Sequence, residues 1–126
     1  MTEKEFYDHI DKHKDNNFIF FGYNTLNNTF QNLEFEVSEK YIQLHRFLPE
    51  NCGETPETFI KNIKELLFEP LTGQETKEII LVILAHHNSQ LAFEILKAFL
   101  AEPPTRELEL FGKLALDEYE IIQRIF

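Results

Sequence analysis

The sequence predicts an all-α fold in which antiparallel helix pairs stack as a short solenoid. The main observation is an internal repeat. When the stretch 59–116 is shifted by 32 residues, its apolar positions fall on apolar or small positions. One helix pair of such a repeat cannot bury its own apolar face, so successive pairs stack on one another. The matched positions are Phe59 with Leu91, Ile63 with Ile95, Leu67 with Phe99, Phe68 with Leu100, Ile80 with Gly112, Ile83 with Ala115, and Leu84 with Leu116.

The length and composition are those of a single domain. The chain has 126 residues, and 43% of them are hydrophobic, which is enough for one ordinary core. The repeat divides the predicted domain into an N-terminal cap region, residues 1–31, and a repeat region, residues 32–126.

The N-terminal part contains one clear helix and one ambiguous stretch. Thr2 is a favourable N-cap, and it predicts a first helix over 2–13. After this helix, apolar side chains at spacings of three and four predict a distorted helix over 18–27 and a regular helix over 32–48. The alternative is a small irregular or hairpin segment near residues 18–37, because apolar and polar residues alternate at its end.

Start and stop signals predict four further helices. Proline and glycine residues interrupt the apolar pattern, and Thr, Asn or Ser residues stand at the expected helix starts. The second of these helices is apolar almost all round, so it is expected to be covered on both sides. The predicted helices span 55–69, with Thr55 as the N-cap, then 74–86, then 88–102, with Asn88 or Ser89 as the N-cap, and 105–126, with Thr105 as the N-cap.

The last predicted helix carries a recognisable packing pattern. Leu108 is followed by two small residues three apart, Gly112 and Ala115, and then by leucine. This segment resembles the inner-packing pattern of the first helix in HEAT repeats, and 76–84 and 40–48 show the same frame with bulkier residues. The resemblance implies a HEAT-like α-solenoid with a scaffold or protein-binding role. It also implies that Gly112 and Ala115 face the core and let the last helix approach its neighbour closely.

The charge balance excludes one class of partner and favours another. Twenty-two acidic residues against twelve basic ones give a formal net charge of −10. Nucleic-acid affinity depends on neutralisation of phosphates by Lys and Arg, so DNA or RNA binding is not expected. A protein partner is expected, and a basic one is favoured.

The sequence also predicts a cytoplasmic protein without membrane contact. Residues 1–14 are polar and charged, which is unlike a signal peptide. The longest apolar run, 79–85, is far below the roughly 20 residues that span a bilayer. Cys52 is the single cysteine, so no internal disulfide can form, and a reducing compartment is the simplest interpretation.

Several residues with potential chemistry have a structural interpretation that we prefer. His9 and His13 have the spacing of metal ligands on a helix, but without neighbouring ligands they are interpreted as a solvated helix face. His86 and His87 lie at a predicted helix end, where histidine can bind free carbonyl groups. Cys52 would need an adjacent base in order to act as a nucleophile.

An enzyme that uses His86 or Cys52 therefore remains an alternative and not the leading hypothesis. The chain has only four glycines and no Gly-rich loop that could cradle phosphates. Glu118 and Glu120 are interpreted as solvated surface. No cofactor and no metal are expected.

The leading hypothesis is a small non-enzymatic interaction module or adaptor that binds a protein through its helix faces. An alternative within the same class is an inhibitor or immunity-type protein that neutralises a basic toxin or nuclease.

The C-terminal tail has more apolar residues than a frayed terminus should leave in water, so it is either core or an interface, including the interface of a homodimer. The predicted partner-binding residues are Lys61, Lys64, Glu65, Glu94, Lys97, Ile121, Ile125 and Phe126.

Overall fold

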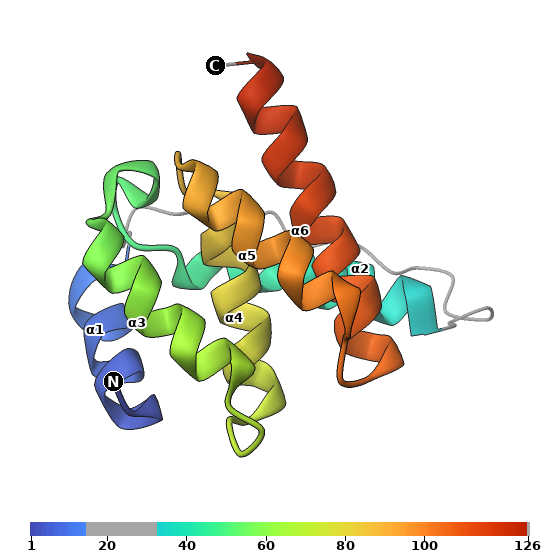
Figure 1. Cartoon of the computed structure of the whole chain (residues 1–126), viewed down its shortest axis with the longest axis horizontal. Coiled ribbons are helices and arrows are strands. Elements are labelled where there is room, and N and C mark those ends of the chain that lie inside the picture. The colour runs from blue at the N-terminus through green and yellow to red at the C-terminus, as the bar shows by residue number, and fades with distance from the viewer. Residues whose placement is uncertain (15–32, 126) are drawn as a thin grey trace.

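The computed structural model describes residues 1–14 and 33–125, and every regular element among them is a helix (Figure 1). The predicted all-α fold is therefore confirmed for this part of the chain. The predicted helix over 18–27 lies outside the described residues, and so does most of the alternative hairpin near 18–37. The elements are α1 (Glu3–His13), α2 (Leu33–Gln43), the short 3₁₀ helices η2 (Leu44–Phe47) and η3 (Cys52–Glu54), α3 (Glu57–Phe68), α4 (Gln74–Ala85), α5 (Gln90–Ala101) and α6 (Arg106–Ile125).

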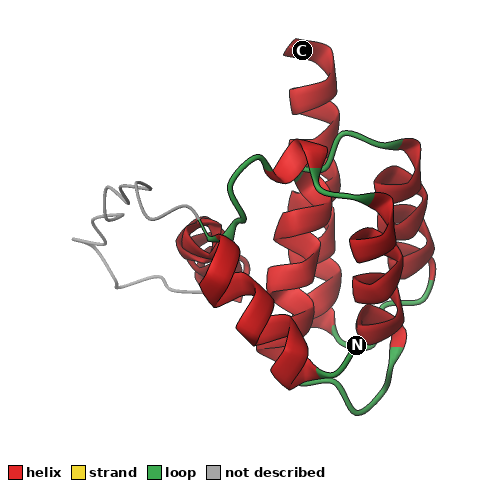
Figure 2. Ribbon diagram, turned by 90° about the vertical axis from the view of Figure 1, so that its left-hand side faces the viewer, coloured by secondary structure: helices red, strands yellow, loops and turns green. Residues whose placement is uncertain are grey.

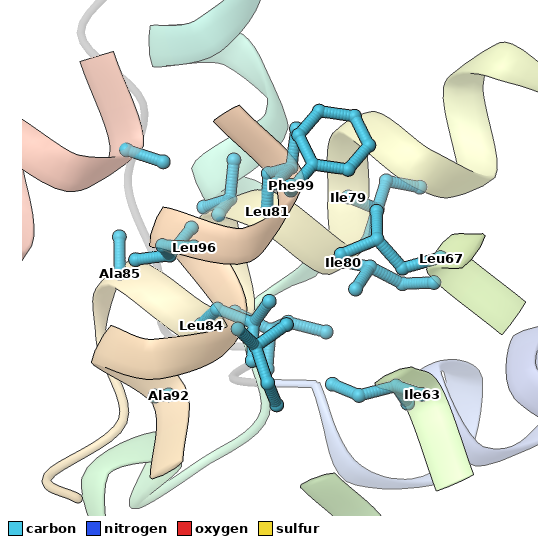
Figure 3. Close-up of a cluster of buried hydrophobic side chains, with 14 of the residues drawn as sticks. Ile63, Leu67, Ile79, Ile80, Leu81, Leu84, Ala85, Ala92, Leu96 and Phe99 are labelled. Atoms are coloured by element: carbon cyan, nitrogen blue, oxygen red, sulfur yellow. The ribbon is translucent and has the colours of Figure 1, made fainter. Parts of the chain in front are cut away.

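Helix α4 forms the centre of the core. Its side chains from Thr76 to Ala85 are all buried, as expected for a helix that is apolar almost all round (Figure 3). It packs against α3, α5 and α6. Its one buried carboxylate, Glu78, is compensated by Lys40 of α2, whose Nζ lies 2.8 Å from Oε1. Among the described helices, none is long and apolar enough to cross a membrane.

The four helices from α3 to α6 pack as two consecutive pairs. Helix α3 contacts α4, and α5 contacts α6; between the pairs, α3 contacts α5 and α4 contacts α6. Helix α2 packs against α6, at the other end of the repeat region. Figure 2 shows the described helices joined by loops, with the C-terminal end of α6 extending beyond the others. In a linear stack each repeat touches only its neighbours. The position of α2 therefore brings the two ends of the repeat region into contact.

Helix α1 is attached to this body by its buried side chains Phe6 and Ile10 and by polar and aromatic contacts. The hydroxyl groups of Tyr7 and Thr76 are 2.9 Å apart, and the ring of His9 stacks on Phe59 at a centroid distance of 4.1 Å. The backbone N–H of Gly73, which precedes α4, donates to Oε1 of Glu3 at 2.6 Å. These contacts place α1 beside α3 and the start of α4.

Three predicted helix starts are confirmed by their capping bonds. The hydroxyl of Thr2 accepts from the backbone N–H of Glu5 in a capping box, Ser89 accepts from Ala92, and Thr105 accepts from Leu108. These bonds satisfy backbone donors that have no partner within the helix.

Two predicted helix boundaries are wrong. The residue before α3 is Pro56, with no side-chain cap, so Thr55 is not the N-cap. The Thr55 carbonyl instead accepts a bond from Nε2 of His87 at 2.6 Å. Helix α2 also ends earlier than predicted, at Gln43, because the chain tightens into the 3₁₀ helix η2.

Small residues bring α6 close to α5. A Cβ atom at Gly112 would lie 2.9 Å from Cδ2 of Leu100, so only glycine allows this separation without a shift of the leucine. Ala115 is fully buried. The close approach predicted from the packing pattern is therefore present.

Candidate functional site

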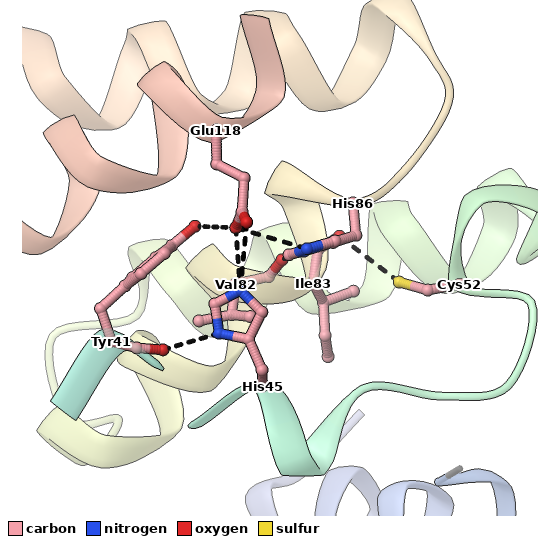
Figure 4. A network of polar contacts seen from close by, with 7 residues as sticks. All are labelled: Tyr41, His45, Cys52, Val82, Ile83, His86 and Glu118. Atoms are coloured by element: carbon pink, nitrogen blue, oxygen red, sulfur yellow. Dashed lines mark hydrogen bonds and ion pairs between the residues drawn. The ribbon is translucent and has the colours of Figure 1, made fainter. Parts of the chain in front are cut away.

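Four polar side chains from different parts of the chain converge between α2, α4 and α6. We call Tyr41, His45, His86 and Glu118 the polar cluster (Figure 4). Tyr41 comes from α2, His45 from η2, His86 from the C-terminal end of α4, and Glu118 from α6.

Local structure explains how each side chain reaches this place. Tyr41 follows Val37 by one helical turn, and both are buried against the rest of the fold. His45 follows Tyr41 by another turn, so the two share one face. Glu118 lies three residues after Ala115, on the side of α6 that faces the core. The cluster therefore borders the apolar core and is not a solvated surface.

The Glu118 carboxylate is the centre of the cluster. The Tyr41 hydroxyl donates to its Oε1 atom at 2.5 Å. Nε2 of His45 lies 3.0 Å from Oε1 and 3.2 Å from Oε2, and Nε2 of His86 lies 3.3 Å from Oε1. Three side chains thus converge on one carboxylate.

Both imidazole rings are fixed by their second nitrogen. Nδ1 of His45 lies 2.8 Å from the Tyr41 carbonyl oxygen, and Nδ1 of His86 lies 2.8 Å from that of Val82. A carbonyl oxygen can only accept, so each Nδ1 carries a proton and donates it. The prediction that His86 binds a free carbonyl at the end of its helix is confirmed.

The environment shifts the pKa values of three members of the cluster. Burial acts to raise the pKa of Glu118, but hydrogen bonds from His45, His86 and Tyr41, with the charge of His86, hold it well below its ordinary value. Burial acts to lower the pKa of His45, but the hydrogen bond and charge of Glu118 outweigh it and raise this pKa. Burial, followed by the charge of Glu118, raises the pKa of the Tyr41 hydroxyl. At neutral pH the cluster therefore holds an ionised carboxylate.

Cys52 lies near the polar cluster but has a different partner. Its Sγ lies 3.6 Å from the carbonyl oxygen of Ile83 (Figure 4). The thiol is buried, and burial raises its pKa to about 12. A protonated thiol that faces a carbonyl group is a poor nucleophile, since the thiolate is the reactive form.

The other histidines have structural contacts. His87 is buried and bridges two turns, because its Nε2 lies 2.6 Å from the Thr55 carbonyl oxygen and its Nδ1 lies 2.8 Å from the hydroxyl of Ser89. The rings of His9 and His13 are 4.3 Å apart, and His9 is half-buried against α3.

The structure brings together most of the predicted partner-binding residues on α3 and α5. Lys61, Lys64 and Glu65 line one open depression of about 590 Å³, together with Phe68 and Leu91. Two further predicted residues, Glu94 and Lys97, are exposed on the neighbouring α5. The Lys97 ammonium lies 5.0 Å from the centre of the Phe93 ring.

The predicted residues of the C-terminal tail lie elsewhere, at the end of α6. Ile121 and Ile125 are 52% and 68% exposed. Phe126 lies outside the described residues. The depression is lined by residues of α3 and α5 and by none of α6, so the two described tail residues form a separate candidate surface.

Sequence reasoning missed the role of Glu118. It was expected to be solvated surface, but its side chain is only 30% exposed and binds three other side chains. The available signal was its position seven residues after Phe111 and three after Ala115, on the apolar stripe of the last helix. A carboxylate on such a stripe needs a polar partner.

Comparisons with protein-family models, with curated proteins and with solved structures give no match for this chain.

Proposed function

We propose that this chain is a small protein-interaction module that binds a basic protein through the exposed end of α6. The observation that carries the proposal is the exposure of two isoleucines on this helix. Ile121 and Ile125 are four residues apart, so they lie on one face, one turn from each other. In Figure 1 the end of α6 extends beyond the other helices. An amphipathic helix of this kind can bind in the apolar groove of another protein.

The charge of the chain favours a basic partner over a second copy. The formal net charge is −10, so two copies would repel each other over most approach directions. Asp117 and Glu120 belong to the same part of α6, and Asp117 is exposed. Complementary charge at the rim of an interface accelerates association and selects the partner.

The packing of the helices supports the same class of function. The contacts between α3 and α5 and between α4 and α6 are those expected of two stacked pairs, in line with a HEAT-like solenoid. In the resembled family such stacks act as scaffolds. The depression lined by Lys61, Lys64 and Glu65 is a second surface that a large partner could contact.

The second candidate function is an inhibitor that neutralises a basic toxin or nuclease. The excess of acidic residues favours it, because an acidic inhibitor can cover the basic surface with which a nuclease binds its substrate. It would act through the same interaction surfaces and needs no catalytic residue.

A pair of matched variants tests the proposal. Ile121→Ser with Ile125→Ser removes the apolar face without a change of charge, and Leu71→Ser removes another apolar side chain that is 91% exposed outside α6. Both proteins should keep the wild-type circular dichroism spectrum. We expect a basic protein from the natural host to be captured by the wild type and by Leu71→Ser but not by the double variant.

Other outcomes would contradict the proposal. Capture of the same partner by the double variant would show that the end of α6 is not the interface. A wild-type dimer in light scattering that becomes monomeric in the double variant would identify a second copy as the occupant. Loss of the folded spectrum in the double variant would show that the two isoleucines belong to the core.

A further inference from the structure

We propose that His45, His86 and Glu118 form a binding site for a divalent transition metal ion, with Zn²⁺ as the best match. The structure places two imidazole nitrogens and one carboxylate, from three different elements, around a common point. This proposal is independent of the proposed protein partner.

The spacing of the three side chains is close to that of a metal site. Their candidate ligand atoms all lie within 4.8 Å of one another. Nε2 of His45 and Nε2 of His86 lie 3.0 and 3.3 Å from the same carboxylate oxygen. Metal–ligand bonds of about 2.0–2.2 Å in a tetrahedron imply ligand separations of roughly 3.3–3.6 Å. Small side-chain rotations are therefore enough to accommodate an ion.

The orientation of the imidazole rings is that of metal ligands. Each Nδ1–H donates to a main-chain carbonyl group, of Tyr41 for His45 and of Val82 for His86, at 2.8 Å. Histidine ligands commonly donate their second nitrogen to a carbonyl or carboxylate, which fixes the tautomer and aims the other nitrogen at the metal. Here both Nε2 atoms, the ones that would bind the ion, point toward Glu118 (Figure 4).

The Tyr41 hydroxyl supports the third ligand. It donates to Oε1 of Glu118 at 2.5 Å and so holds the carboxylate in place. Outer hydrogen bonds of this kind typically contribute about 10–100-fold to metal affinity. Tyr41 would remain a positioning residue, since its hydroxyl binds the carboxylate and not the ion.

The ligand set selects the class of metal. Two imidazoles and one carboxylate suit Zn²⁺ and neighbouring transition metals, whereas Mg²⁺ and Ca²⁺ prefer oxygen ligands alone. The side chains of His45, His86 and Glu118 are 16%, 19% and 30% exposed, so an ion can reach them while they remain largely shielded from water. Three protein ligands leave a fourth position for water. Among the residues that the structure describes, these three form the one group of this kind.

Metal binding would also stabilise the folded state. The ligands come from η2, the end of α4, and α6, so an ion would connect segments that are distant in sequence. An ion that binds only the folded state stabilises it. Stoichiometric Zn²⁺ should therefore raise the melting temperature.

The test uses the full chain, freed of metal with EDTA and dialysed, with Zn²⁺ alone as the probe. Competition with a chromophoric chelator gives the stoichiometry and affinity, and Co²⁺ in place of Zn²⁺ reports the ligand geometry by its visible absorption. We expect one bound ion, a loss of affinity of at least about tenfold in His45→Gln, His86→Gln and Glu118→Gln, and a loss of about 10–100-fold in Tyr41→Phe. The control, His9→Gln with His13→Gln, removes the other histidine pair and should bind as the wild type does.

The outcomes distinguish a specific metal-binding site from incidental binding of the ion. The proposal would be overturned if the wild type bound no stoichiometric Zn²⁺. It would also be overturned if binding were lost in the His9/His13 control and retained in the cluster variants. Affinity unchanged in all variants would indicate an adventitious ion only and would also overturn it. If a cluster variant fails to fold by circular dichroism, the zinc complex of the folded His9→Gln, His13→Gln control is measured by X-ray absorption. Two imidazole ligands in that complex support the site, and none or one contradicts it.

Discussion

The carboxylate of Glu118 on α6 lies 3.0 Å from Nε2 of His45 in η2, 73 residues earlier in the chain. This contact connects the last helix to the segment that follows α2. The same carboxylate also accepts from the Tyr41 hydroxyl and lies 3.3 Å from Nε2 of His86. One side chain thus joins α6 to both α2 and the end of α4.

Replacement of Glu118 by alanine should therefore destabilise the fold. The change leaves the hydroxyl of Tyr41 and the two histidine Nε2 atoms without their common acceptor, and hydrogen bonds to charged groups contribute about 1.5–3 kcal/mol each. We expect Glu118→Ala to lower the free energy of unfolding by at least about 2 kcal/mol, measured by urea denaturation in EDTA so that no metal contributes.

Asp117→Ala is the control, because it removes a carboxylate from an exposed position of the same helix. It should lower the free energy of unfolding by less than about 0.5 kcal/mol, as is usual for surface substitutions. Equal effects of the two substitutions would show that the contacts of Glu118 contribute nothing beyond helix propensity.

The polar cluster should make stability depend on pH in two opposite ways. The pKa of Glu118 is lowered from 4.5 by the fold, so its contribution is complete above that value and is lost as the pH falls through the lowered pKa. The pKa of His45 is raised from 6.5, so its contribution is complete below that value and is lost as the pH rises through the raised pKa. The combined contribution is therefore greatest between about pH 4.5 and 6.5.

The difference between the wild type and His45→Gln isolates this effect from the other titrating groups. Urea unfolding of both proteins from pH 4 to pH 9, in EDTA, should give a difference in free energy of unfolding that decreases as the pH rises above 6.5. A difference that stays constant over this range would show that the His45 imidazole does not interact with Glu118 in its charged form.

The sequence was sufficient to predict structural features that depend on nearby residues, such as helix N-caps and the buried face of a helix. Thr2, Ser89 and Thr105 cap helices as predicted, because an N-cap hydroxyl binds a backbone donor only three residues away. Ala115 is buried as predicted, because the apolar stripe of α6 defines which side faces the core.

What depends on tertiary contacts could not be predicted in the same way. At the start of α3, Thr55 was predicted as the N-cap, but the residue before the helix is Pro56, and the bond from His87 to the Thr55 carbonyl is not visible in local sequence. The polar cluster is assembled from residues as distant as Tyr41 and Glu118, 77 positions apart. The sequence shows that Glu118 lies on an apolar stripe of the last helix, but it does not show which side chains Glu118 contacts.

The packing of α6 predicts the effect of a larger residue at position 115. Ala115 is fully buried, and interiors are too closely packed to accept a phenylalanine ring. Ala115→Phe should lower the free energy of unfolding by about 1–3 kcal/mol in urea denaturation. Lys113→Phe, at an exposed position of the same helix, is the control and should change it much less. Equal stability of Ala115→Phe and the wild type would contradict the position of α6.

The surroundings of Cys52 predict that its thiol reacts slowly. It is buried, its Sγ lies 3.6 Å from the Ile83 carbonyl oxygen, and burial raises its pKa to about 12, so almost no thiolate is present at pH 8. Reaction with a disulfide reagent at pH 8 should be at least about 100-fold slower in the native protein than in urea. The unfolded chain is the control, since it contains the same cysteine without burial. A native rate equal to the unfolded rate would show that Cys52 is an accessible thiolate, and would favour the alternative in which this residue performs chemistry.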